Sequence, residues 1–173
     1  MEDSHSVLKA VELYLIRHGI AKERGIDSKD YDRTLTDQGR QKTWKVAQRL
    51  YQLGLRFDLI LTSPLVRSRQ TAEILCSSGL SSQVEEHTFL APDGDIHTWL
   101  GWLEQQQHPI ITQLALVGHQ PDLGQWAEIL VWGKAREVLV LKKAGIIGLT
   151  LPETGSALGQ SQLFWLTPPK LLL

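Results

Sequence analysis

The stretch Val11-Glu12-Leu13-Tyr14-Leu15-Ile16 leads directly into Arg17-His18-Gly19. A short, mostly apolar run of this kind is typical of a strand buried in a parallel sheet. Two further runs end in the same way, because Phe57 to Leu61 leads into Thr62-Ser63-Pro64 and Leu114 to Val117 leads into Gly118-His119. Ligands of open α/β sheets bind at the carboxyl ends of parallel strands. We therefore expect these three strands to be neighbours and to present one binding site at that edge.

Helical segments alternate with the predicted strands, and the chemistry of their ends supports the assignment. Thr36 is an expected N-cap and Gly54 an expected stop for a helix over 37–53. Ser63 and Pro64 are expected at the N-cap and first position of the next helix, which runs to about Cys76. The other predicted helices cover 95–107 and the segment from Pro121 to Trp132, and the other predicted strands cover 83–87, 138–141, 146–151 and 163–166. This order predicts an α/β fold with helices on both faces of a mostly parallel sheet and an antiparallel edge.

The residues at the strand ends are those that bind and attack phosphate. A neutral His18 can act as a nucleophile toward phosphorus, since the ordinary imidazole pKa is about 6.5. Guanidinium groups of Arg17 and Arg67 can grip a phosphoryl group, and His119 can donate a hydrogen bond to it. Gly19 and Ser63 lie where they could also contact the phosphate. The alternative is that these are structural residues, with Arg17 paired to Asp32 or Asp37, but one shared site accounts for all four side chains at once.

Composition and charge limit the remaining possibilities. The 173 residues carry a net charge of −1, which suggests neither bulk nucleic-acid nor membrane affinity. The length predicts one domain over 1–173, with a loose leader at 1–10. The single cysteine, the polar start and the lack of a long apolar run predict a cytoplasmic protein, and a monomer is the default expectation. No closely spaced histidine, cysteine or carboxylate pair predicts a metal site.

The motifs together resemble those of the histidine phosphatase (phosphoglycerate mutase-like) superfamily. Besides Arg17-His18-Gly19, the stretch Arg33-Thr34-Leu35-Thr36-Asp37-Gln38-Gly39 is similar to the family's Leu-Thr-x-x-Gly segment. The segment from Thr62 to Ala72 is similar to its Ser-Pro-x-x-Arg-x-x-Gln-Thr segment, and Val117-Gly118-His119 to its second-histidine block. The resemblance spans about residues 11 to 125 and implies a three-layer α/β/α sandwich. It also implies a phosphohistidine intermediate on His18, a phosphate pocket completed by Arg17, Arg67 and His119, and no metal or organic cofactor.

Within that superfamily the short chain looks most like the SixA-type phosphohistidine phosphatases. Pro92-Asp93-Gly94-Asp95 resembles a turn of that group, and there is little room for the helical cap of larger members. The expected substrate is a phosphohistidine in a partner protein, such as a phosphorelay domain in signal transduction. One alternative is a small phosphomonoester, whose alkoxide leaving group needs a general acid. The local carboxylates are Glu85, Glu86, Asp93 and Asp95. The other alternative is a phosphoprotein-binding module without turnover.

Overall fold

The computed structural model describes residues 10–26, 29–106 and 111–173. Most of the predicted leader, His5, His108 and the last residue of the helix predicted over 95–107 lie outside these ranges. The strands are β1 (Glu12–Arg17), β2 (Leu59–Thr62), β3 (Val84–Glu86), β4 (Gln113–Gly118), β5 (Ile146–Thr150) and β6 (Gln162–Thr167). The α-helices are α1 (Asp37–Gln52), α2 (Val66–Ser77), α3 (Ile96–Glu104) and α4 (Asp122–Trp132). Short 3₁₀ helices cover Asp30–Asp32, Thr88–Leu90 and Pro169–Leu171.

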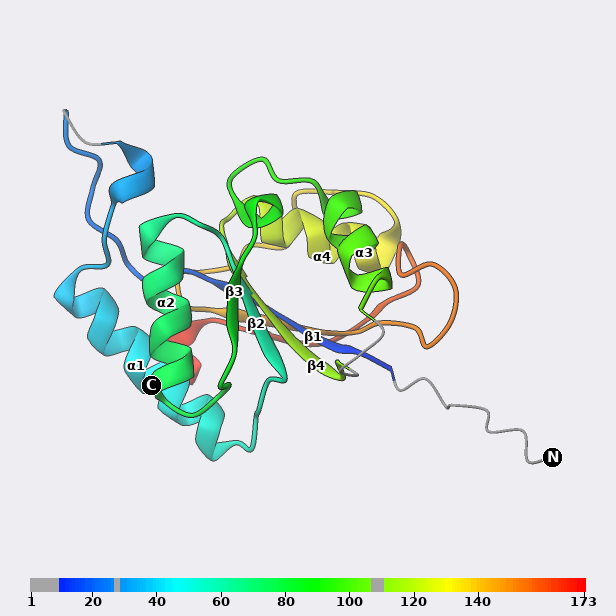
Figure 1. Ribbon diagram of the computed structural model, residues 1–173, viewed down its shortest axis with the longest axis horizontal. Helices are drawn as coiled ribbons and strands as arrows, with labels where there is room; N and C mark the ends of the chain where they lie inside the picture. The colour runs from blue at the N-terminus through cyan, green and yellow to red at the C-terminus, as the bar shows by residue number, and fades with distance from the viewer. Residues whose placement is uncertain (1–9, 27–28, 107–110) are drawn as a thin grey trace.

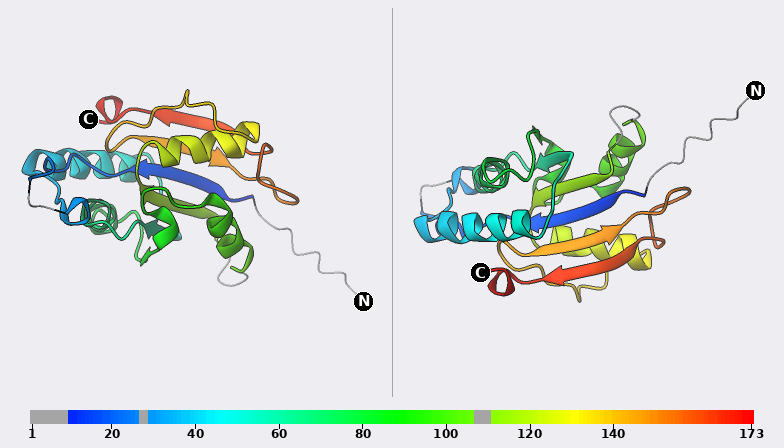
Figure 2. Two further views of the ribbon diagram at one scale, coloured as in Figure 1. Left: turned by 90° about the horizontal axis from the view of Figure 1, so that it is seen from above. Right: turned by 90° about the horizontal axis from the view of Figure 1, so that it is seen from below.

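The six strands of the described chain form one sheet in the order β3-β2-β4-β1-β5-β6. Strands β3, β2, β4 and β1 are parallel, whereas β5 is antiparallel to β1 and β6 is antiparallel to β5. Figure 2 shows this antiparallel pair, orange to red, at one edge beyond the blue β1. In Figure 1, α1 and α2 cover one face of the sheet and α3 and α4 cover the other. The predicted three-layer α/β/α sandwich is confirmed.

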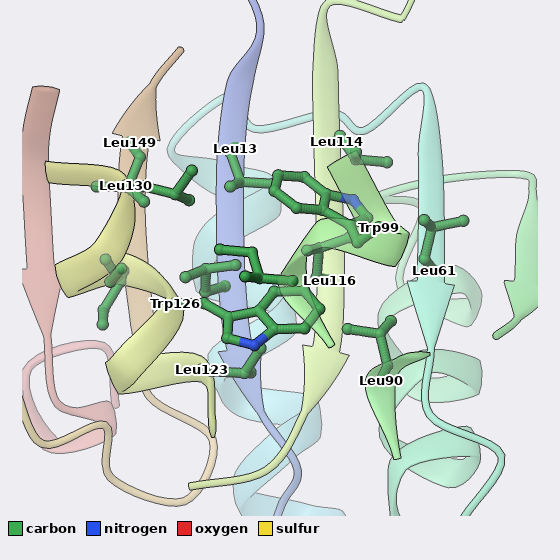
Figure 3. Close-up of a cluster of buried hydrophobic side chains, with 14 of the residues drawn as sticks. Leu13, Leu61, Leu90, Trp99, Leu114, Leu116, Leu123, Trp126, Leu130 and Leu149 are labelled. Atoms are coloured by element: carbon green, nitrogen blue, oxygen red, sulfur yellow. The ribbon is translucent and has the colours of Figure 1, made fainter. Parts of the chain in front are cut away.

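Alternating residues of the central strands build two separate cores. Leu13 and Leu15 of β1 face the side of α3 and α4, and Tyr14 and Ile16 belong to the core under α1 and α2. Figure 3 shows the first core, in which indole rings from α3 and α4 lie against leucines of β1 and β4. Burial on both faces explains why these strands are apolar at nearly every position.

Of the two N-cap residues predicted from the sequence, Thr36 is confirmed and Ser63 is not. Thr36 caps α1 as predicted, because its hydroxyl accepts a hydrogen bond from the Gly39 amide at 2.9 Å. The prediction that Ser63 caps α2 is wrong, since that helix begins at Val66 and its N-cap is Leu65. The hydroxyl of Ser63 is instead shared between the Leu65 amide and His119. Serine before proline therefore supplies a side chain to the site rather than a helix cap.

The segment predicted as a strand over 138–141 is not part of the sheet. The amide groups of Val138 and Leu139 are bound by Glu128 of α4, whose side chain is fully buried. The oxygens of Glu128 accept hydrogen bonds from four consecutive backbone amides, at residues 136 to 139. An amide bound to a carboxylate cannot also join a strand ladder, so the start of this run is held against α4 instead.

No helix within the described ranges is long and apolar enough to cross a membrane.

Candidate active site

The register of the two central strands places the two predicted histidines side by side. Arg17 of β1 is opposite Gly118 of β4, so that the next residue of each parallel strand is a histidine. The amide of His18 continues the ladder by donating to the Gly118 carbonyl at 3.0 Å. The imidazole rings of His18 and His119 have centroids 5.3 Å apart. The two imidazoles therefore come together because β1 and β4 are parallel neighbours, as the sequence predicts.

The hydrogen bonds of His18 fix which ring nitrogen carries the proton. Nδ1 lies 2.7 Å from the carbonyl oxygen of Gly19, and Nε2 lies 3.2 Å from Nε of Arg67. A carbonyl only accepts and a guanidinium only donates, so Nδ1 bears the hydrogen and Nε2 presents its lone pair. A lone pair held beside a guanidinium is suited to attack on an electrophile that the guanidinium binds.

The turn after His18 is held in place by two neighbouring helices, α1 and α2. The amide of Gly19 donates to Thr71 of α2 at 3.0 Å. A Cβ atom at Gly19 would lie 2.3 Å from the Thr43 hydroxyl, and one at Gly39 would lie 2.0 Å from the Ile20 carbonyl oxygen. Glycine is therefore required at both positions because the turn lies directly on α1.

Arg67 lies at the start of α2 and is only 4 % exposed. Besides its contact with His18, its terminal nitrogens donate to the carbonyl and carboxylate oxygens of Asp30, at 2.7 and 3.0 Å. Asp30 belongs to the loop between β1 and α1 and also pairs with Arg33 at 2.9 Å. Sequence reasoning did not single out Asp30, because no local signal indicates where a long loop folds back. One carboxylate oxygen and the backbone carbonyl oxygen of Asp30 thus occupy donors of Arg67 that two phosphoryl oxygens could also accept.

His119 is oriented by hydroxyl groups from the other side of the site. Its Nε2 lies 2.8 Å from the Ser63 oxygen and 3.4 Å from the Ser68 oxygen. The sequence predicts phosphate contacts for Ser63 and Gly19, but neither lines the pocket. The polar groups of both are engaged in holding the two histidines, so the structure gives them a positioning role.

Arg17 retains unused hydrogen-bonding capacity. Its side chain donates to the Leu141 carbonyl at 3.1 Å, and its buried Nε has no partner among the described residues. The structure does not pair Arg17 with Asp32 or Asp37, the carboxylates considered from the sequence. Burial and the nearby charge of Arg67 lower the pKa of Arg17. A partly desolvated guanidinium without a carboxylate partner favours an incoming anion.

The four predicted side chains line one pocket of about 260 Å³ at the carboxyl edge of the sheet. Its complete lining is Arg17, His18, Arg33, Arg67, Pro92, Asp93, His119, Gln120, Pro121, Asp122 and Lys143. The predicted convergence of two imidazoles and two guanidiniums is thus observed. A volume of this size is suited to a phosphoryl group with part of its carrier, in a site where cations outnumber carboxylates.

The carboxylates considered as general acids lie in different places. Asp93 lines the pocket, whereas Glu85 pairs with His87, Glu86 with Arg69, and Asp95 caps α3. Sequence reasoning missed Asp122, which also lines the pocket and accepts a hydrogen bond from the Asp93 amide at 3.0 Å. Burial, together with the charge of Asp93, raises the pKa of Asp122. The sequence signal that could have identified Asp122 as a pocket residue is its position three residues after His119.

Both histidines are held in the neutral form. Each is only 5 % exposed. Burial, assisted by His119, Arg67 and Arg17, lowers the pKa of His18 to about 3. Burial and the charges of Arg67 and Arg17 lower the pKa of His119 to about 4, although Asp30 acts in the opposite sense. At neutral pH the His18 lone pair is therefore available without prior loss of a proton.

Among residues 10–26, 29–106 and 111–173, no group of three or more histidine, cysteine or carboxylate side chains is arranged to hold a metal ion.

Comparison with known proteins places this site in a family. Residues 13–90 match the model of the histidine phosphatase superfamily, branch 1. An uncharacterized protein of Picosynechococcus sp. is 50 % identical over 167 residues, which are 94 % of this chain and 99 % of that protein. The chain belongs to the histidine phosphatase superfamily. The resemblance inferred from the motifs is confirmed, and with it the general activity of a phosphatase.

Solved structures share the fold over nearly the whole chain. The protein histidine phosphatase SixA complexed with tungstate has a TM-score of 0.81 at 24 % identity, and covers 94 % of this chain and 100 % of its own. A phosphoserine phosphatase from Entamoeba histolytica has a TM-score of 0.66 at 18 % identity, and covers 94 % of this chain and 100 % of its own. Proteins that act on a phosphohistidine and on a phosphoester are thus both built on this fold.

Proposed function

We propose that this protein hydrolyses phosphohistidine in a partner protein, through a covalent phosphohistidine intermediate on His18. The observation that carries the proposal is the unprotonated Nε2 of His18, held beside Arg67 in a pocket rich in cations. The partner would be a cytoplasmic signalling protein, such as a phosphorelay domain. The SixA-like fold, the superfamily and the site geometry support this choice.

The reaction follows from the arrangement in two steps. In the first, the lone pair of His18 Nε2 forms a bond to phosphorus, and the phosphorus–nitrogen bond of the substrate breaks. The electron pair leaves with the substrate imidazole, while Arg17, Arg67 and His119 hold the phosphoryl oxygens. In the second, a water oxygen bonds to phosphorus and loses a proton to solvent, while the bond between phosphorus and Nε2 breaks and its electron pair returns to Nε2. The Nδ1–H bond to the Gly19 carbonyl stabilises the positive ring of the phosphorylated His18.

The leaving group favours phosphohistidine as the substrate. A phosphohistidine already protonated on its other ring nitrogen releases a neutral imidazole, which requires no strong acid. A phosphoester releases an alkoxide, whose protonation needs a positioned general acid. Glu85 and Glu86 are exposed and paired with basic side chains, so that among the described carboxylates only Asp93 or Asp122, which line the pocket, could supply that acid.

The test replaces the nucleophile and a matched surface histidine. His18→Ala should abolish release of phosphate from a phosphohistidine protein, and His97→Ala, on the exposed side of α3, should leave it unchanged. Wild-type protein quenched during turnover should carry phosphate that is stable to base and labile to acid. Hydrolysis by His18→Ala at the wild-type rate would contradict the assignment. A binding module without turnover would carry no such covalently bound phosphate.

The position of Asp122 favours a second candidate, a small phosphomonoester. A carboxyl group with a raised pKa in the pocket could protonate an alkoxide. If so, Asp122→Asn should lower kcat on a phosphoester by about 100-fold and leave hydrolysis of phosphoimidazole nearly unchanged. A wild-type preference for the ester over phosphoimidazole would replace the first proposal with this one.

A further inference from the structure

A second, larger cavity adjoins the phosphate pocket. It has a volume of about 660 Å³ and is lined by Arg17, Ile20, Lys42, Lys142, Lys143, Pro168, Pro169 and Lys170. Two of these residues, Arg17 and Lys143, also line the phosphate pocket. The two spaces therefore share a wall, and a molecule whose phosphoryl group is bound at His18 can extend directly into this cavity. We refer to it as the basic groove.

The charges of the basic groove all have the same sign. Its lysines come from α1, from the turn before β5 and from the 3₁₀ helix Pro169–Leu171, and no carboxylate is part of the lining. None of the salt bridges found among the described residues uses Arg17, Lys42, Lys142, Lys143 or Lys170. Five cations brought together from distant parts of the chain, without internal counterions, repel one another and generate a positive potential. Such a surface favours a negatively charged occupant.

The wall between these cations is apolar, and this narrows the class of occupant. Ile20, Pro168 and Pro169 contribute it, together with the aliphatic stems of the lysines. A free inorganic anion would gain nothing from an apolar wall and needs far less space. A protein surface that presents carboxylates around an apolar side chain fits both features.

The basic residues of α1 differ in whether they line this groove. Lys42, Lys45 and Arg49 form a basic stripe in the sequence. Lys42 is half-buried and lines the groove, whereas Lys45 and Arg49 are exposed and do not. The stripe is thus not uniform, and the two members outside the groove, Lys45 and Arg49, provide a control of the same charge on the same helix.

We propose that the basic groove docks an acidic surface of the substrate protein, next to its phosphorylated histidine. This inference rests on the proposed function and adds the substrate's distinguishing feature, namely carboxylate side chains flanking the phosphohistidine. Residues three or four positions from a helical phosphohistidine lie about 5–6 Å from it, which matches a groove that shares a wall with the phosphate pocket. Docking supplies affinity and orientation for the partner, while the phosphate pocket alone carries out the chemistry.

The test uses paired charge reversals on the full chain. The docking variant is Lys42→Glu with Lys170→Glu, and the control variant is Lys45→Glu with Arg49→Glu. Each is assayed on a phosphohistidine peptide with flanking glutamates, on one with flanking lysines, and on phosphoimidazole. The docking variant should lose about tenfold or more in kcat/KM on the acidic peptide, and less than twofold on phosphoimidazole. The control variant should match the wild type on every substrate.

Binding measured without catalysis separates the two proposals. An unphosphorylated acidic, amphipathic peptide should bind the wild type and the control variant, with an affinity that falls as salt is added. Its binding to the docking variant should be at least about tenfold weaker. Peptide binding without hydrolysis of any phosphohistidine would overturn the proposed function alone. Hydrolysis that is indifferent to flanking charge, or equal peptide binding by both variants, would overturn the docking proposal alone.

Discussion

The two buried histidines of the phosphate pocket should make the free energy of unfolding fall as the solution becomes acidic. Their pKa values in the folded protein are about 3 for His18 and about 4 for His119, against about 6.5 in an unfolded chain. Between these limits the unfolded chain binds protons that the folded protein does not. By linkage, this contribution to the free energy of unfolding is fully present above the unfolded-state pKa of about 6.5, and it is lost as the pH falls below that pKa.

The size of this effect can be worked out at about pH 5. An unfolded imidazole is then about 97 % protonated, while folded His18 is about 1 % protonated. This pH lies about 1.5 units below the unfolded-state pKa of each histidine, which corresponds to a loss of about 2 kcal/mol per histidine. The two together should remove about 4 kcal/mol between about pH 7.5 and pH 5. This is a large part of the 5–15 kcal/mol typical of a folded domain.

The measurement is urea unfolding, followed by tryptophan fluorescence, at both pH values. His18→Gln and His119→Gln should each reduce the pH-dependent loss of stability by about 2 kcal/mol, whatever their stability at the higher pH. His97→Gln removes an exposed imidazole and should retain the full loss. The carboxylates whose pKa is lowered, such as Asp30, titrate at lower pH and are common to all four proteins. A pH-dependent loss in His18→Gln as large as in the wild type would refute the reasoning.

Three further predictions concern the scaffold around the site. Glu128→Gln places an amide donor against four backbone amides and should lower the free energy of unfolding by about 3 kcal/mol or more, whereas exposed Glu137→Gln should change it little. Gly39→Ala should cost about 1–3 kcal/mol and reduce phosphatase activity, because its methyl group would displace the Ile20 carbonyl in the turn after His18. The matched helical change Gly101→Ala meets open space and should be neutral or stabilising by about 0.5–1 kcal/mol. Trp99→Ala should lower the free energy of unfolding by about 3–5 kcal/mol, since this indole is fully buried against Trp126. Urea unfolding checks all of these stability predictions. A loss below about 1 kcal/mol for Glu128→Gln would contradict the account of its four amide bonds.

The central strands and the two histidines were predictable because their signals are local. Apolar runs that end in Gly-flanked histidines define both the strand and the position of the side chain at its end. Parallel pairing then requires only that β1 and β4 be neighbours, and the register brings His18 beside His119. Arg67 followed from its place in the first turn of α2, whatever residue caps that helix.

The features that sequence reasoning missed depend on contacts between distant segments. Asp30 reaches Arg67 because the loop after β1 folds back, and the composition of a loop does not reveal that path. The strand-like run at 138–141 was misread because its first two amides bind Glu128, about ten residues earlier in the chain. Trp44 and Tyr51 share one face of α1 with Ala47 and Leu50 in the sequence pattern, yet they are 39 % and 43 % exposed. The buried face includes Val46, Ala47 and Leu50, because α1 also approaches α2 and the turn after His18.

One arrangement of charge accounts for two properties of the site. Burial is the main cause of the low pKa of His18 and His119, and the cations that lower it further are the groups proposed to hold the phosphoryl dianion. In the free protein, burial and these cations together keep His18 neutral, with the lone pair of Nε2 available for attack. A dianion bound among Arg17, Arg67 and His119 cancels much of their charge, and a neighbouring negative charge favours the protonated imidazole. The pKa of His119 must therefore rise when the phosphoryl group binds, so that this residue becomes a better hydrogen-bond donor at the moment when negative charge has to be stabilised.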